Sequence, residues 1–114
     1  MEFERVTDGS FSIVRVPSRV DVTNTQELLS AVRSCTAQGS DQVILDLSAT
    51  EAIDSTALGA IVSLYKSLRV GEGDLKLASV QEGVKRVLAL TRLDRVFDAY
   101  DDVAAAKGAT QAAS

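Results

Sequence analysis

The run Val43-Ile44-Leu45-Asp46-Leu47 constrains the fold more than any other part of this 114-residue chain. All of its residues except the aspartate are large and aliphatic, which is typical of a strand covered on both faces, as in a parallel sheet. Parallel neighbours need long crossover connections, and these are usually helices. The run therefore predicts an α/β fold with helices packed on a largely parallel sheet.

Strand and helix patterns alternate along the rest of the chain, with no internal repeat or linker. We therefore expect one compact domain over residues 1–107, with a mixed, largely parallel β-sheet of four or five strands. The small, polar residues 108–114 predict a flexible C-terminal tail. Besides residues 43–47, strands are expected at 11–16, at 75–77, at 96–97 and, on weaker evidence, at 3–6. Helices are expected from residues 23–27 to Gly39, over 55–69, around 84–91 and over 101–107.

Composition excludes several classes of function. The chain has no histidine, which excludes Ser-His-Asp catalysis and histidine-ligated zinc. Cys35 is the one cysteine, so it can form neither an internal disulfide nor a thiolate metal site. We expect no catalytic and no metal-binding residues. Twelve basic residues against sixteen acidic ones indicate no nucleic-acid surface. The sequence has no signal peptide and no apolar run long enough for membrane insertion, so a cytoplasmic protein is expected.

The most informative segment is Asp54-Ser55-Thr56-Ala57-Leu58-Gly59, between the apolar strand and the second helix. Asp54 is expected to cap that helix, with Ser55 and Thr56 in its first turn. Loops at the carboxyl end of a parallel strand often carry function. Periodicity alone favours the simpler interpretation that the segment is an ordinary helix start. A nucleophilic Ser55 would have no histidine to activate it, and the nearest lysine, Lys66, lies three turns further along.

The charge pattern around this segment is uneven. No lysine or arginine lies between Arg33 and Lys66, whereas Asp41, Glu51 and Asp54 fall in loops or caps. This predicts a mildly electronegative face, which is either ordinary surface variation or a surface that docks on a basic partner.

Together with the apolar strand behind it, the segment resembles the signature of the STAS domain family. This family includes the bacterial anti-sigma factor antagonists, or anti-anti-sigma factors, and the cytoplasmic domains of sulfate transporters. The resemblance covers about residues 10–106, including Val16-Pro17-Ser18-Arg19-Val20-Asp21. The chain departs from the family pattern at Ser18, where glycine is common. It also departs at Thr50 and Ala52, where larger apolar residues are usual.

The resemblance implies a STAS-type fold and a partner-switching regulator of transcription rather than an enzyme. Ser55 matches the serine that a partner anti-sigma factor, itself a serine kinase, phosphorylates; Thr56 is the alternative acceptor. The unphosphorylated protein would bind the kinase and free a sigma factor, and a metal-dependent serine phosphatase would reset the switch. ATP and magnesium would belong to the kinase, so no cofactor is expected here. The implied partner-binding residues are Asp21, Asp54, Ser55, Thr56, Ala57, Leu58 and Gly59.

Several alternatives stay open. Asp21 corresponds to a family acid near the docking surface, or serves as a turn or cap residue. The chain could instead be a non-catalytic scaffold or regulatory subunit, in a stressosome-like assembly or beside a lipid-transport ATPase. A third interpretation is a domain that binds a small ligand. A monomer is the default expectation.

Overall fold

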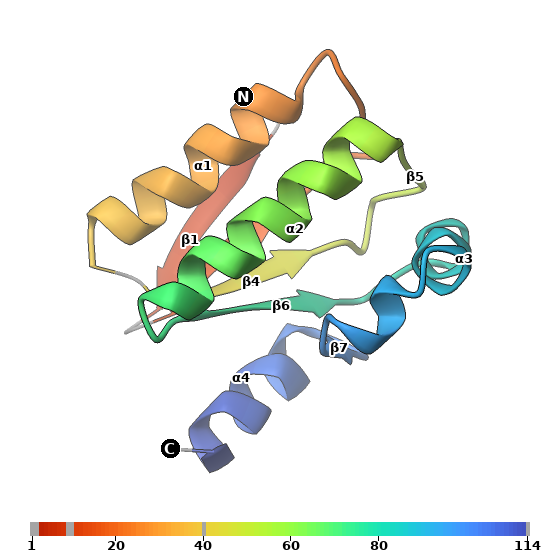
Figure 1. Ribbon diagram of the computed structural model, residues 1–114. Coiled ribbons are helices and arrows are strands. Elements are labelled where there is room, and N and C mark those ends of the chain that lie inside the picture. The colour runs from red at the N-terminus through yellow and green to blue at the C-terminus, as the bar shows by residue number, and fades with distance from the viewer. Residues whose placement is uncertain (1–2, 9–10, 40, 114) are drawn as a thin grey trace.

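The computed structural model describes residues 3–8, 11–39 and 41–113, and shows a mixed α/β domain (Figure 1). The strands are β1 (Glu4–Asp8), β2 (Phe11–Arg15), β3 (Arg19–Val20), β4 (Gln42–Asp46), β5 (Ala52–Ile53), β6 (Asp74–Ala78) and β7 (Ala99–Tyr100). The helices are α1 (Thr25–Ala37), α2 (Ser55–Val70), α3 (Glu82–Leu90) and α4 (Val103–Ala113), with a 3₁₀ turn at Leu93–Arg95.

The main sheet has five strands in the order β1-β2-β4-β6-β7. β1 runs antiparallel to β2, and every other pair is parallel. This confirms the predicted mixed, largely parallel sheet. The two short strands β3 and β5 form a separate parallel pair, in which Arg19 lies opposite Ala52 and Val20 opposite Ile53.

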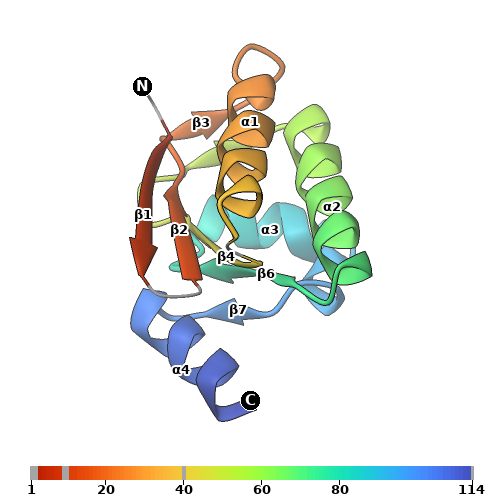
Figure 2. The ribbon, with the colours of Figure 1, turned by 90° about the vertical axis from the view of Figure 1, so that its left-hand side faces the viewer.

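Helices cover both faces of the sheet. α1 and α2 lie side by side on one face, and α4 lies on the other (Figures 1 and 2). Val43 and Leu45 belong to the larger core cluster, on the side of α1 and α2, whereas Ile44 belongs to the smaller cluster with Ala106 of α4. The central strand β4 is thus buried on both sides, which explains its nearly continuous aliphatic sequence.

Two local predictions differ from the structure. The strand expected at residues 96–97 is not formed, and the last strand is β7, two residues further on. The backbone N–H groups of Val96 and Phe97 both donate to the carbonyl of Leu93, so this segment is turned out of the ladder. Phe97 is instead a core residue, and its ring packs edge-on against Tyr65 with the centroids 5.3 Å apart.

The C-terminal helix is also longer than expected. Residues 108–113, predicted as part of a flexible tail, continue α4 as far as Ala113, and Ser114 lies outside the described residues. The carboxylate of Asp102 accepts a hydrogen bond from the N–H of Ala105 at 2.8 Å, which supports the first turn. Alanine is the strongest helix former, and a single Gly108 does not end an alanine-rich segment.

Candidate partner-binding site

The site is built on the start of α2, which follows β5 directly. Asp54 has extended backbone angles (φ −87°, ψ 177°), and its Oδ1 accepts a hydrogen bond from the N–H of Ala57 at 2.8 Å. This confirms Asp54 as the N-cap of α2. The cap leaves the N–H groups of Ser55 and Thr56 at the positive end of the helix dipole, where an anion is stabilised.

Asp54 also joins two distant parts of the chain. Its Oδ2 accepts a hydrogen bond from the backbone N–H of Val22 at 3.2 Å, and its own N–H donates to the carbonyl of Val20 at 3.1 Å. The loop after β3 is thereby held against the start of α2. The carboxylate is bonded on both oxygens, which fixes its orientation at the start of α2.

Hydrogen bonds within the loop that carries Val22 also stabilise it. The carboxylate of Asp21 accepts hydrogen bonds from the N–H of Thr23, at 2.9 Å, and from the Thr23 hydroxyl. These bonds, with the nearby charge of Arg19, hold the pKa of Asp21 below its usual range. Asp21 is therefore a turn residue that stays ionised, which matches one of its two expected roles. Its role in docking stays a prediction.

The first helix begins within the expected range of residues 23–27. Asn24 is the N-cap of α1, but its side chain makes no cap hydrogen bond. Instead Asn24 Oδ1 accepts from the N–H of Asp21 at 2.9 Å, and its amide nitrogen donates to the carbonyl of Arg19 at 2.9 Å. The Asn24 side chain thus holds the preceding residues, from Arg19 to Asp21, against the start of α1. Gly39, with φ +96°, follows the end of α1 as predicted.

The structure divides the predicted partner-binding residues into two groups. Ser55, Thr56 and Gly59 are exposed, and a Cβ added at Gly59 would meet open space. Ala57 and Leu58 are buried in the core between α2 and the sheet, so their side chains are not available to a partner. Which of these residues contact a partner stays a prediction, and Ser55, Thr56 and Gly59 form the accessible side of the segment. The helical period of 3.6 places residues 55, 56 and 59 outward and residues 57 and 58 inward.

Val22 is the site residue that the sequence did not indicate. Val22 is 69% exposed, so its apolar side chain is accessible to a partner. It lies beside the N-cap of α2 through its bond to Asp54. An isolated valine in a loop carries no recognisable sequence signal, and only the fold brings it to Ser55. We call Val22, Asp54, Ser55, Thr56 and Gly59 the acceptor face.

Buried contacts fix the segment that leads to the acceptor face. Thr50 is fully buried, and its hydroxyl donates to the carbonyls of Val16, at 3.1 Å, and Pro17, at 2.9 Å. Thr50 was noted as a departure from the family pattern, and these bonds give it a structural role. Gly83 of α3 packs closely on the same segment, since a Cβ there would lie 2.6 Å from the carbonyl oxygen of Glu51.

Residues 3–8, 11–39 and 41–113 contain no group of three or more histidine, cysteine, aspartate or glutamate residues that could hold a metal ion. Over the same ranges, no helix is long and apolar enough to cross a membrane. The acceptor face presents two exposed hydroxyls beside a carboxylate whose two oxygens both accept hydrogen bonds.

Comparison with known proteins agrees with this geometry. The STAS domain family model matches residues 2–106. The chain is 28% identical to the anti-sigma-B factor antagonist of Staphylococcus epidermidis over 93 residues, which cover 82% of this chain and 86% of that protein. It is 44% identical over 69 residues to a Thermotoga maritima protein provisionally named as an anti-sigma factor antagonist. That match spans 60% of this chain and 61% of the relative's length.

Solved structures with the same fold match most or nearly all of the chain. The crystal structure of a Thermotoga maritima protein, also provisionally named as an anti-sigma factor antagonist, has a TM-score of 0.87 at 32% identity. The match covers 96% of this chain and 94% of that one. The unphosphorylated form of SpoIIAA has the same fold, with a TM-score of 0.73 at 15% identity over 85% of this chain and 86% of that one. The chain belongs to the STAS domain family, and its relatives are named as regulators of transcription, which confirms the resemblance seen in its sequence.

Proposed function

We propose that this protein is a cytoplasmic anti-sigma factor antagonist whose binding to its partner is switched off by phosphorylation of Ser55. The observation that carries the proposal is the placement of Ser55. It is exposed in the first turn of α2, beside a carboxylate that hydrogen bonds hold on both oxygens. The names of the relatives support the same role.

The partner in this proposal is an anti-sigma factor that is also a serine kinase. It binds the unphosphorylated acceptor face and releases its sigma factor, and a metal-dependent serine phosphatase later removes the phosphate. The kinase supplies ATP and magnesium, so this chain needs no cofactor and performs no catalysis. Its own contribution is to present the hydroxyl and the surface around it.

The local electrostatics are suited to such a switch. Phosphorylation adds about −1.5 to −2 charges, which the free N–H groups and the helix dipole tolerate, so the fold survives. Asp54 stays where it is, and two like charges about 4 Å apart repel by roughly 1 kcal/mol even in water. A docked partner must also desolvate the phosphate. A total penalty of about 3 kcal/mol would weaken binding more than 100-fold.

Phosphopeptide mass spectrometry tests the proposal directly. The protein is incubated with lysate of its native cells, ATP, magnesium and a phosphatase inhibitor, and then digested with trypsin. Residues 34–66 form one tryptic peptide, because they contain no earlier lysine or arginine. We expect phosphate on Ser55 and none in the Ser55→Ala variant. A well-detected peptide without phosphate would overturn the switch and favour a scaffold role, whereas phosphate on Thr56 alone would move the acceptor by one residue.

A further inference from the structure

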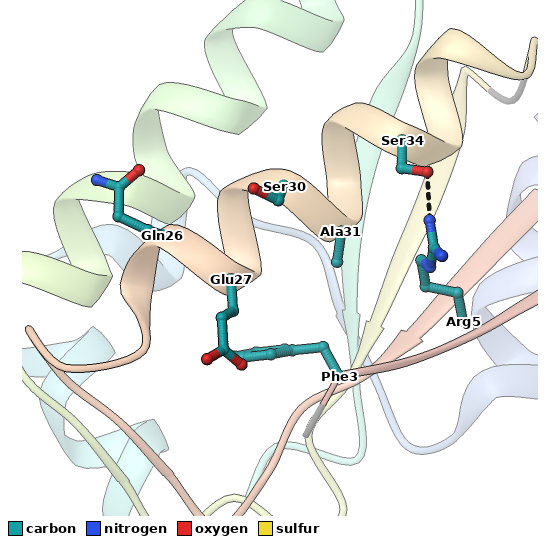
Figure 3. Close-up of a pocket in the computed structure, with 7 residues that line it drawn as sticks. All are labelled: Phe3, Arg5, Gln26, Glu27, Ser30, Ala31 and Ser34. Carbon is teal, nitrogen blue, oxygen red and sulfur yellow. Dashed lines mark hydrogen bonds between the residues drawn. The ribbon is translucent and has the colours of Figure 1, made fainter. Parts of the chain in front are cut away.

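A groove separate from the acceptor face lies between β1 and α1 (Figure 3). It has a volume of about 390 Å³. The buried side chains of Phe3 and Ala31 form an apolar floor, and Ser30 lies on the α1 wall. The site proposed above uses none of these residues.

Opposite charges mark the two ends of the groove. Glu27 lies in the first turns of α1. Arg5 belongs to β1, and its guanidinium donates to the hydroxyl of Ser34, about two helical turns further along α1 (Figure 3). Both charged residues are exposed. Along the helix axis, residue 34 lies about 10 Å beyond residue 27. The groove therefore offers an acid, an apolar floor and a base in a row of roughly that length.

The strand beside the groove has an unpaired edge. Within the described residues β1 pairs with β2 only, and it is the outermost strand of the five-stranded sheet. In an antiparallel ladder, alternate residues direct their N–H and C=O groups away from the partner strand. β1 thus offers a row of free backbone donors and acceptors next to the groove, which is the arrangement that extended peptides use when they add to a sheet.

We propose that this groove binds an extended segment of a partner protein that carries a basic, an apolar and an acidic residue at alternate positions. Alternate residues of an extended peptide lie on one face, and the first and fifth are about 13 Å apart. A basic side chain then reaches Glu27, the apolar one lies on Phe3 and Ala31, and an acidic one reaches Arg5. This inference goes beyond the switch at Ser55 and does not depend on it.

Titration with synthetic peptides, followed by backbone amide NMR shifts, tests the proposal. The probe is acetyl-Lys-Ser-Leu-Ser-Glu-amide, and its control has serine in place of leucine. We expect shifts confined to β1 and α1. Burying a leucine side chain contributes about 1.5–3 kcal/mol, so the control peptide should bind at least about tenfold more weakly. N-methylation of the amides that face β1 should also weaken binding.

Charge reversals give a sharper test, since each predicts a change of preferred peptide. Arg5→Glu makes both ends of the groove acidic and should favour acetyl-Lys-Ser-Leu-Ser-Lys-amide over the probe. Glu27→Lys makes both ends basic and should favour the peptide with glutamate at both ends. Each exposed charge contributes up to about 1 kcal/mol, so each preference should change by roughly fivefold. Arg86→Glu on α3 changes the net charge as Arg5→Glu does, and should leave the preference unchanged.

Three results would overturn the proposal: no shifts at millimolar peptide, shifts centred elsewhere, or the same peptide preference in all variants. Both reversed residues are exposed, and the unbound spectra will show whether each variant is folded. Ser55→Asp should bind the probe as the original protein does. A negative result in the peptide titration would therefore not contradict the proposed switch at Ser55.

Discussion

The Oδ2 atom of Asp54 accepts a hydrogen bond from the backbone N–H of Val22 at 3.2 Å, between residues 32 positions apart in the sequence. The other carboxylate oxygen caps α2 through the N–H of Ala57. One side chain thus holds both the helix that presents Ser55 and the loop beside it. These bonds, and the other contacts around the acceptor face, lead to five measurable predictions.

Removing this carboxylate should destabilise the protein. Asp54→Ala loses the cap and the bond to Val22, and loss of an N-cap typically costs about 1 kcal/mol. We expect the free energy of unfolding to fall by about 1–2 kcal/mol, measured by urea denaturation. Asp98→Ala, at an exposed aspartate, serves as the control and should change stability by less than about 0.5 kcal/mol. Equal losses in both variants would show that Asp54 does not hold the two segments together.

The two standard substitutions at Ser55 should separate binding from stability. Ser55→Ala should bind the purified anti-sigma factor constitutively, and Ser55→Asp should bind it more weakly by a large factor, approaching the 100-fold expected for the phosphate. Their melting temperatures should stay close, because an acid in the first turn of a helix is tolerated. Isothermal titration and thermal melts measure the two quantities. Equal affinity of the two variants would contradict the switch.

Val22 should contribute to partner affinity but little to stability. Val22 is 69% exposed and so has little burial to lose, whereas fully burying a valine side chain against a partner contributes about 1.5–3 kcal/mol. Val22→Ser should therefore weaken binding by about fivefold or more at unchanged unfolding free energy. Val70→Ser is the matched control, since Val70 is 87% exposed at the other end of α2. If both serine variants bind alike, Val22 lies outside the interface.

Thr50→Val should destabilise the fold although the two side chains have nearly the same shape. The substitution leaves the carbonyls of Val16 and Pro17 without the hydroxyl that they now accept from. An unsatisfied buried polar group costs about 1–3 kcal/mol, which chemical denaturation will resolve. Thr36→Val, at an exposed threonine of α1, should cost much less. A Thr50 variant as stable as the original would mean that the loop finds other donors.

The depressed pKa of Asp21 predicts a dependence on acid. A carboxyl with a pKa lower in the folded than in the unfolded state adds stability above its unfolded value, near 3.8, and this is lost as pH falls through the folded pKa. Asp21→Asn should therefore lose stability relative to the original protein at neutral pH, and the difference should shrink below pH about 4. Thermal melts across pH, with Asp98→Asn alongside, will show this. A constant difference would exclude titration of Asp21 as its cause.

The features that could be predicted from the sequence were mostly local ones. The cap at Asp54 acts three residues away, and the stop at Gly39 depends on its own backbone, so both follow from short patterns. The bonds of Thr50 and of Val22 cross more than 30 residues, and no short pattern indicates them. The strand wrongly expected at residues 96–97 also reflects packing between distant parts of the chain, which no short pattern indicates. An aromatic residue buried by packing, here Phe97, gives the same sequence signal as a strand residue.

The hydrogen bond between Asp54 and Val22, which are distant in the sequence, affects how a partner can recognise this protein. Val22 follows β3 and Ser55 follows β5, and α1 and β4 lie between these two paired strands in the sequence. A linear peptide around Ser55 contains the acceptor hydroxyl without Val22 and without the anchored carboxylate. In the proposed switch, a partner that contacts the whole acceptor face would therefore bind the folded molecule and not nascent, truncated or unfolded copies. The same surface would then report both the folding and the phosphorylation of the protein.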